Sequence, residues 1–372
     1  MAIGPRDTSS LVLMTGWDAT ALKNWQLADG TSIAAVQAQM NAGLGALNAE
    51  LTGGLWGQLI SFQDKPDVEY AMGDTGEMEL HTEYSRPDSQ RASTEGHMLP
   101  YQKFDRGLGW TWDYLEEARQ EQIDADLALA FQAVRNRWRL SLLTRLLQRG
   151  DDSGAGKGLG TGGLSPGFAT TAGSTGVDYV PPTYGGTAFA NTHEHYVGIT
   201  GGVFTNAVFT DVRSELREHG HQPPYNFIAG ISDEAAISAL TNFIPIAQTN
   251  VRYGNTVDLA AISAEPLAEG VYPIGVISDS VVYIVPGIPQ YYGFGWKSYG
   301  NLSRRNPLRV RTTKGASRPM VMASNDPRNG SPAHPLQYMM LQFRFGVGVG
   351  EERTNGTPRY VNSATWADGT PT

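Results

Sequence analysis

Apolar side chains recur every three or four residues in two stretches of the chain, and this spacing predicts two helices that face a core. The first stretch, residues 32–51, carries apolar side chains at Ile33, Val36, Met40, Leu44, Leu47 and Leu51. Gly43 and Gly45 lower its intrinsic helix propensity. We therefore expect a helix that depends on docking against the rest of the protein.

The second stretch, residues 113–149, is the clearest element of the sequence. No glycine or proline interrupts its apolar stripe, which is formed by Leu115, Ala118, Ile123, Leu127, Phe131, Val134, Trp138, Leu142 and Leu146. Acidic residues gather near its start and arginines near its end, which complements the helix dipole. One continuous helix of this length would span about 50 Å. We expect it to serve as a long structural strut.

In residues 77–84 a period of two replaces the helical period, which predicts a strand with one charged face and one largely apolar face. The first face holds Glu77, Glu79, His81 and Glu83, and the second holds Met78, Leu80, Thr82 and Tyr84. A second extended run follows over residues 97–104, so residues 66–104 form a long hairpin. Because an isolated two-stranded ribbon is marginal in water, either this chain's own core or a neighbouring copy must cover its apolar face.

The rest of the chain mixes short helices with strands. We expect a helix over residues 205–219 and strands near residues 227–231, 272–277 and 281–285, followed by strands over residues 339–349 and 359–361. The most apolar stretch contains Pro273, Asp279 and Pro286 and is typical of buried strands rather than a membrane span. These patterns predict an α+β fold class and no membrane partner.

Composition narrows the possible functions. The chain has 372 residues, a formal net charge of −9 and no cysteine. The acidic balance argues against a protein whose main task is gripping nucleic acid, because phosphate contacts require Lys and Arg. Without cysteine, the chain has no disulfides, no thiolate nucleophile and no cysteine metal site.

Charge is also distributed in two opposite blocks. Residues 64–95 hold nine acidic and three basic residues, whereas a later stretch without acidic residues holds Arg304, Arg305, Arg309, Arg311, Lys314 and Arg318. An exposed ion pair contributes at most about 1 kcal/mol, so scattered surface charge is the simplest interpretation. Two blocks of equal size also suggest a contact, within one chain or between two. A nucleic-acid patch is the third interpretation.

The sequence contains two His-x-His pairs, His193 with His195 and His219 with His221. Side chains two positions apart on a strand point the same way, so each pair could reach one metal ion. However, no His-Glu-x-x-His motif accompanies them, and His219 falls at the end of a predicted helix, where an imidazolium is favoured. We expect structural histidines and assign no metal ligand and no catalytic residue, with a metal site as the alternative.

The order of these elements resembles that of the major capsid proteins of tailed bacteriophages, whose fold lineage includes herpesvirus shells and encapsulins. An acidic extended segment precedes a long helix, an α+β unit follows, and long strands close the chain. Residues 191–196, followed by a helix and the second histidine pair, also look like sequences in some of these proteins. The resemblance implies an N-terminal arm, an extended loop, a peripheral domain with a spine helix over residues 113–149, an axial domain and returning peripheral strands. These would occupy residues 1–60, 61–112, 113–200, 201–300 and 301–372.

The resemblance also implies a function. A member of this family is a non-enzymatic structural protein that self-assembles, through hexameric and pentameric capsomers, into the icosahedral head shell around a tailed phage's double-stranded DNA. It would be located in the virion and assembled in the host cytoplasm, with a separate scaffolding protein, a portal and, in some shells, a decoration protein as partners. Packaged DNA would be held only by weak non-specific contact, and no cofactor is expected. An encapsulin-like compartment and a β-rich enzyme with a histidine-bound metal are the alternatives.

In such a shell, the two charge blocks would meet at a contact between copies. We expect the extended loop of one copy to contact the basic run of another copy. The loop contributes Glu77, Met78, Glu79, Leu80, Glu83 and Tyr84. The basic run contributes Arg304, Arg305, Arg309 and Arg311.

Overall fold

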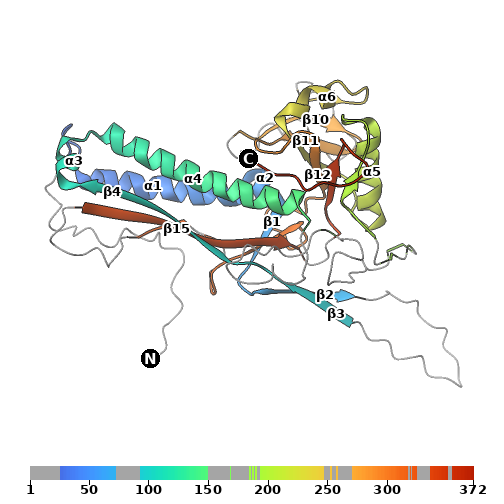
Figure 1. The fold of residues 1–372 in the computed structure, drawn as a ribbon, viewed down its shortest axis with the longest axis horizontal. Coiled ribbons are helices and arrows are strands. Elements are labelled where there is room, and N and C mark those ends of the chain that lie inside the picture. The colour runs from blue at the N-terminus through green and yellow to red at the C-terminus, as the bar shows by residue number, and fades with distance from the viewer. Residues whose placement is uncertain are drawn as a thin grey trace, which may run out of the picture.

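Two β-sheets organise the chain, and helices cover both of them (Figure 1). The computed structural model describes residues 26–72, 93–149, 168, 184–185, 187, 189–190, 193–246, 252–253, 257–258, 270–316, 319, 321–324, 336–350 and 354–372. The helices are α1 (Ile33–Thr52), α2 (Gly54–Leu59), α3 (Trp112–Glu117), α4 (Gln120–Leu147), α5 (Asn206–Glu218), the 3-10 helix η2 (Ile231–Asp233) and α6 (Glu234–Ser238). The mixed α+β class is as predicted.

The described residues contain sixteen strands, which form the two sheets and two small two-stranded ribbons. They are β1 (Ile60–Gln63), β2 (Asp67–Met72), β3 (Ser93–Met98), β4 (Gln102–Thr111), β5 (Val197–Gly198), β6 (Tyr225–Ala229), β7 (Ile244–Pro245), β8 (Arg252–Tyr253) and β9 (Val257–Asp258). The others are β10 (Tyr272–Ile277), β11 (Ser280–Ile284), β12 (Tyr292–Trp296), β13 (Leu308–Arg311), β14 (Val321–Ser324), β15 (Leu336–Val349) and β16 (Thr357–Tyr360). β2 pairs with β3, and β8 with β9, outside the two larger sheets.

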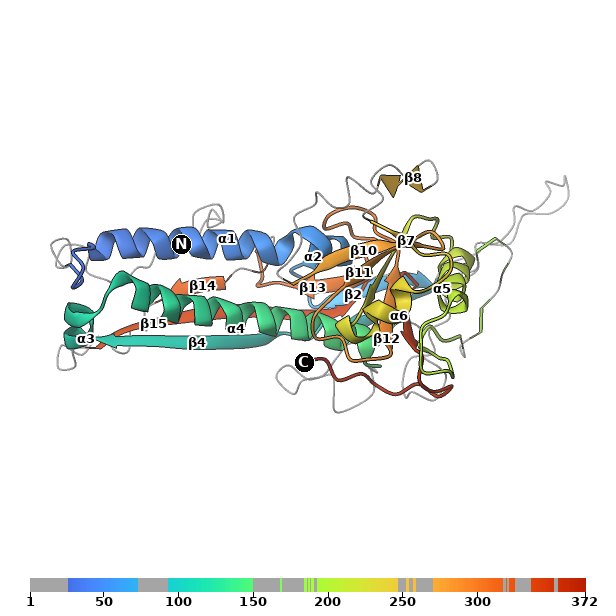
Figure 2. The ribbon, with the colours of Figure 1, turned by 90° about the horizontal axis from the view of Figure 1, so that it is seen from above.

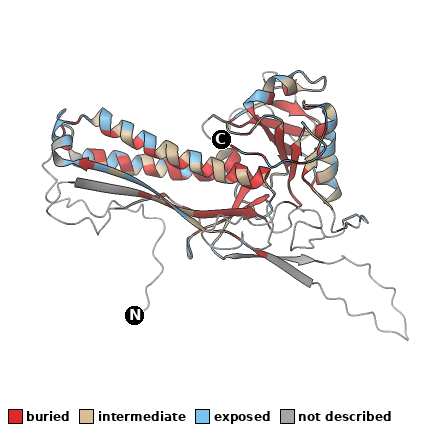
Figure 3. Cartoon of the chain, viewed as in Figure 1, coloured by how far each residue is buried: buried red, intermediate tan, exposed pale blue. Residues whose placement is uncertain are grey.

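The five-stranded sheet is built on β15, which pairs with β4, β13 and β14, while β1 pairs with β13. Helices α1 and α4 run side by side along it (Figure 2). The ring of Trp138 on α4 packs against Phe343 and Phe345 on β15, with centroids 5.6 and 5.0 Å apart. Arg135 on α4 forms an ion pair with Glu50 on α1 at 2.9 Å. These contacts bury the facing sides of helices and sheet (Figure 3).

The helix predicted over residues 32–51 is confirmed as α1. The hydroxyl of Ser32 accepts a hydrogen bond from the Ala35 backbone N–H and caps its first turn. Five of the predicted apolar positions are buried: Val36, Met40, Leu44, Leu47 and Leu51. Helix α1 thus docks through the stripe that its sequence defines.

The single helix predicted over residues 113–149 is wrong, because the chain forms two helices, α3 and α4, separated at Ala118 and Arg119. A segment distant in sequence causes the break. The Ala28 N–H donates to the Ala118 carbonyl oxygen at 3.0 Å, and Asp29 Oδ2 accepts the Gln120 N–H at 2.8 Å. Helix α4 keeps 28 residues, which corresponds to about 42 Å.

The seven-stranded sheet has the order β5-β16-β12-β6-β11-β10-β7. The helix predicted over residues 205–219 is confirmed as α5, which packs on this sheet through the contact of Phe209 with Phe227, centroids 4.8 Å apart. The predicted strand pair is confirmed as β10 and β11, joined by a tight turn in which Ser278 and Asp279 have φ values of 46° and 67°. Strands β5 and β16 bring residues from outside 201–300 into the same sheet.

Long strand β15 confirms the period of two predicted for the C-terminal region, with Leu341, Phe343, Phe345, Val347 and Val349 all buried. The extended run predicted over residues 97–104 is interrupted instead, because β3 ends at Met98 and β4 begins at Gln102. Within the described residues, no helix combines the length and apolarity that a membrane crossing requires.

Candidate functional site

Strands β2 and β3 form a hairpin that projects from the layered body of the protein (Figure 1). They pair antiparallel from Asp67 opposite Met98 to Met72 opposite Ser93. The connecting residues 73–92 lie outside the described part of the chain, together with the alternating strand predicted there. The predicted loop contacts therefore stay predictions: Glu77, Met78, Glu79, Leu80, Glu83 and Tyr84.

The base of the hairpin is anchored in its own chain. Val68 and Leu99 are buried, and the Leu99 N–H donates to the Pro66 carbonyl oxygen at 2.7 Å. His97 is buried as well, and its Nε2 donates to the carbonyl oxygen of Val349 at 3.2 Å. Met98, between them, is 56% exposed. One face of the hairpin base therefore packs on the body while the other faces solvent.

The end of β13 and the residues that follow it complete this anchor. Arg311 Nη1 donates to the Leu99 carbonyl oxygen at 3.1 Å, and the guanidinium lies 5.1 Å from the centre of the Tyr101 ring. The Tyr101 hydroxyl in turn hydrogen-bonds the Thr313 hydroxyl at 2.9 Å. Arg311, expected to contact another copy, thus binds the hairpin base of its own chain.

The basic run divides into buried and exposed members. Arg304 and Arg305 are exposed, and the guanidinium of Arg305 stacks 3.9 Å from the centre of the Tyr299 ring. Arg309 is fully buried, and its Nη2 donates to the Arg304 carbonyl oxygen at 3.1 Å. Lys314 is exposed as well, so the side chains of Arg304, Arg305 and Lys314 are described members of this run that another molecule can reach.

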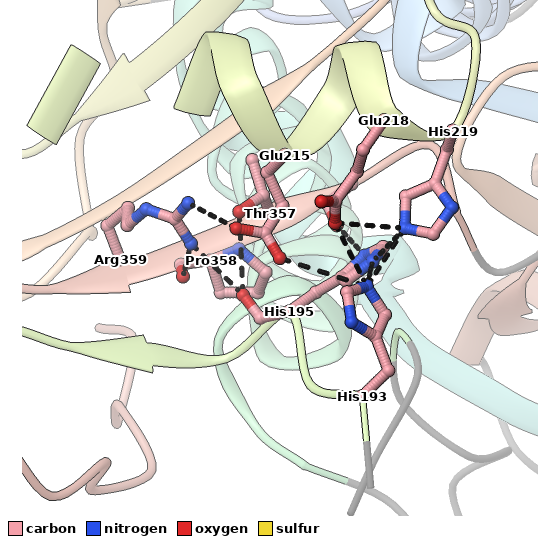
Figure 4. A network of polar contacts seen from close by, with 9 residues as sticks. His193, His195, Glu215, Glu218, His219, Thr357, Pro358 and Arg359 are labelled. Carbon is pink, nitrogen blue, oxygen red and sulfur yellow. Dashed lines mark hydrogen bonds and ion pairs between the residues drawn. The ribbon is translucent and has the colours of Figure 1, made fainter. Parts of the chain in front are cut away.

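In the structure, three of the four histidines of the two His-x-His pairs lie together, and the fourth, His221, lies apart from them. His221 Nδ1 lies 2.7 Å from the Tyr299 hydroxyl and its Nε2 lies 3.2 Å from the Thr354 hydroxyl, so it has a structural role as expected. The other three converge on one point beside the C-terminal end of α5 (Figure 4): His193, His195 and His219.

Glu218, the last residue of α5, points into the same cluster (Figure 4), although it belongs to neither His-x-His pair. Burial lowers the pKa of His195 well below its usual value and the pKa of His219 to about 3, so both imidazoles are neutral. Burial and the neighbouring Glu215 raise the pKa of Glu218 to about 7. The only sequence signal for Glu218 is its position next to a histidine at a predicted helix end.

No protein-family model and no curated protein sequence matches the chain. Among solved structures, that of Mycobacterium phage Patience contains a chain that is 19% identical and covers 92% of both chains, with a TM-score of 0.60. A chain of the mature capsid of bacteriophage PhiM1 is 8% identical over 82% of this chain and 86% of that one, with a TM-score of 0.48. A chain of a virus-like particle from Pyrococcus furiosus is 8% identical over 88% and 98%, with a TM-score of 0.40.

The two sheets, the paired long helices and the projecting hairpin define a chain of mixed α+β architecture. The similarity to the Mycobacterium phage Patience chain extends over nearly the whole of both chains. The chain therefore has the phage capsid fold, as its element order implies.

Proposed function

We propose that the chain is the major capsid protein of a tailed phage, a non-enzymatic subunit that assembles into the closed icosahedral head shell around double-stranded DNA. The observation that carries the proposal is the match of fold over 92% of both chains with the Mycobacterium phage Patience chain. The projecting β2–β3 hairpin supports it, because a shell subunit needs an element that reaches over its neighbours. Closed shells arise from heterologous contacts whose rotations close.

The contact between copies would pair the acidic loop of one hairpin with the basic run of another copy. Arg304 and Arg305 would carry this contact, because their side chains are exposed. Arg309 and Arg311 would support it indirectly, since the first is buried and the second holds the hairpin base. Each exposed pair would add at most about 1 kcal/mol, so the contact would depend on several pairs and on burial of the apolar face.

The other partners follow from the same proposal. The subunit would form hexameric and pentameric capsomers in the host cytoplasm, guided by a separate scaffolding protein, and would end in the virion with a portal and, in some shells, a decoration protein. A net charge of −9 suits a lumen that holds packaged DNA only by weak non-specific contact.

Particle morphology tests the proposal. The full-length chain is expressed, purified and concentrated, and its assemblies are followed by light scattering and negative-stain electron microscopy. Closed shells, or rings of five and six copies, are the expected result. A stable compact monomer at high concentration would contradict the proposal, and small shells that enclose an enzyme and no DNA would favour the encapsulin-like alternative.

A further inference from the structure

Three imidazole nitrogens meet at one point in the described part of the chain (Figure 4). The Nε2 atom of His219 lies 2.8 Å from that of His195 and 3.0 Å from that of His193. The Nε2 atoms of His193 and His195 are 3.1 Å apart. Three ring nitrogens at these mutual distances need protons, or another positive centre, between them.

Protons cannot satisfy all three contacts. His195 Nδ1 lies 2.9 Å from the Gly356 carbonyl oxygen, which only accepts, so the proton of this neutral ring is on Nδ1 and its Nε2 carries a lone pair. Each of the other two rings places at most one proton on Nε2, and that proton points along a single direction. At most two of the three pairs of nitrogens can therefore share a hydrogen bond, and at least one pair lies at close range without one.

The hydrogen bond from His195 to a backbone carbonyl is itself typical of a metal-binding histidine. Histidines that bind metal ions commonly donate their other ring N–H to a carbonyl or carboxylate, which fixes the tautomer and the ring orientation. Residue His195 is completely buried, so its orientation is set by the protein before any ion binds.

Glu218 supplies a fourth donor atom. Its Oε1 is buried and has no hydrogen-bond partner among the described residues. The same atom lies 3.2 Å from His193 Nε2 and 3.6 Å from His219 Nε2. A buried carboxylate oxygen without a hydrogen bond is costly, unless a cation occupies the point toward which it is directed.

The spacing of the four atoms is close to that of a tetrahedral metal site. In a tetrahedral site with bonds of about 2.0–2.1 Å, ligand atoms are about 3.3–3.4 Å apart. Five of the six distances among the three nitrogens and the Glu218 oxygen run from 2.8 to 3.6 Å, and the donor atoms of the four residues all lie within 4.8 Å of one another. We propose that His193, His195, His219 and Glu218 bind one Zn²⁺ ion.

The surroundings of the cluster suit an ion that is structural rather than catalytic. Four protein ligands close a tetrahedral site and leave no position for water or substrate. The neighbouring carboxylate of Glu215 is paired through Oε2 with the buried Arg359 at 3.2 Å, and its Oε1 lies 4.0 Å from His193 Nε2, farther than the oxygen of Glu218. The ring of Phe189 stacks on that of His219, with centroids 4.3 Å apart, and covers one side of the cluster with apolar surface.

The ion would join segments that are distant in sequence. His193 and His195 precede β5, whereas Glu218 and His219 end α5, and Gly356 directly precedes β16. Zn²⁺ would therefore fasten one edge of the seven-stranded sheet to the helix that covers it. This role is independent of whether the chain forms a shell, so failure of one proposal leaves the other standing.

Metal content and stability test the proposal on the full-length chain. The protein is loaded with Zn²⁺, dialysed and measured by elemental mass spectrometry and by competition with a chromogenic chelator, next to the double variant His193→Gln/His219→Gln. We expect the wild type to hold one Zn²⁺ per chain and the double variant to bind it at least about a hundredfold more weakly. A chelator should lower the Tm of the wild type, and Zn²⁺ should restore it, because an ion that binds only the folded state stabilises it.

His221→Gln is the matched control, since His221 is two residues from a proposed ligand but binds Tyr299 and Thr354 instead. This variant should keep its Zn²⁺. If the double variant does not fold, the visible spectrum of Co²⁺-loaded wild type decides, and tetrahedral bands are expected. The proposal is overturned if the wild type retains no more Zn²⁺ than the double variant, if chelation leaves its Tm unchanged, or if the Co²⁺ spectrum is not tetrahedral.

Discussion

The guanidinium of Arg311 donates a hydrogen bond to the carbonyl oxygen of Leu99, 3.1 Å away, and so joins β13 to the base of the β2–β3 hairpin. Leu99 is buried and its neighbour Met98 is 56% exposed. The chain therefore fixes where the hairpin leaves the body and leaves part of its base open to solvent. A shell subunit whose hairpin contacts another copy needs the hairpin to leave the body at a fixed position.

Gly346 on β15 is needed where the hairpin base crosses this strand. A Cβ atom at this position would overlap the carbonyl oxygen of Pro100, so the backbone of residues 100–101 lies directly against the strand. We expect Gly346→Ala to lower the free energy of unfolding by about 1–3 kcal/mol, because the base must shift to admit the methyl group. Urea denaturation measures this loss, and electron microscopy should show fewer closed shells.

Gly45 provides the matched control for this substitution. It lies inside α1, and no atom outside its own helix backbone and chain neighbours is within 4 Å of the position of a Cβ atom. Gly45→Ala should therefore raise stability by about 0.5–1 kcal/mol and leave assembly intact. Normal stability and normal shells from Gly346→Ala would show that the base tolerates displacement.

Charge reversal addresses the contact between copies. Arg304→Glu with Arg305→Glu should reduce the yield of shells, because both side chains are exposed and would then repel an acidic loop. Adding Glu79→Arg and Glu83→Arg should restore part of the yield, measured by sedimentation and electron microscopy. The control Arg304→Lys with Arg305→Lys keeps the charge and should assemble. Normal assembly of the reversed variant would mean that these arginines do not carry the contact.

Asp29 stabilises the start of α4 from outside the helix. Its carboxylate accepts the backbone N–H groups of Gln120 and Thr31 at 2.8 and 2.9 Å, and these hydrogen bonds lower its pKa below 3.8. A carboxyl whose pKa is lowered by folding contributes stability above its unfolded pKa, and this contribution is lost as the pH falls through the folded pKa. We expect Asp29→Asn to lower the protection factor of the Gln120 amide against hydrogen exchange near neutral pH, and acid to lower the same protection factor in the wild type. Equal protection in both proteins at neutral pH would refute this role.

Asn306 is a buried polar link between β1 and the loop that precedes β13. Its amide nitrogen lies 3.1 Å from the Ile60 carbonyl oxygen and 2.9 Å from that of Gly300, and its oxygen accepts the Tyr299 N–H at 3.1 Å. Asn306→Ala should cost about 2–3 kcal/mol in urea denaturation, since it leaves these buried groups without partners. The exposed Asn362, replaced by Ala, should change stability by less than about 0.5 kcal/mol. A similar small effect at both positions would contradict the role of Asn306.

Much of the fold could be predicted where local pattern and burial agree. The apolar stripe of α1 and the alternation of Leu341, Phe343 and Phe345 on β15 each match the face that packs on the core. The break between α3 and α4 could not be predicted, because Ala118 and Arg119 lie in a sequence with good helix propensity. Contacts from residues 28–29, about ninety positions away, produce it.

The candidate sites could also be predicted only in part, because the sequence shows which residues are present but not which distant residues they meet. Both His-x-His pairs were visible in the sequence, but the meeting of His193 with His219, 26 residues apart, depends on how α5 packs. Arg309 belongs to a basic run, yet it lies on β13 between β1 and β15, where both neighbouring strands and the body enclose it. Charge pattern alone does not report which arginines are enclosed in this way.

A cryo-electron microscopy map of the assembled particle tests the central claim most directly. If the chain is a shell subunit whose hairpin reaches a second copy, residues 67–98 of each subunit will lie against a neighbouring subunit in a closed icosahedral particle. A map in which this segment folds back onto its own subunit, with no contact to a second copy, would contradict the account.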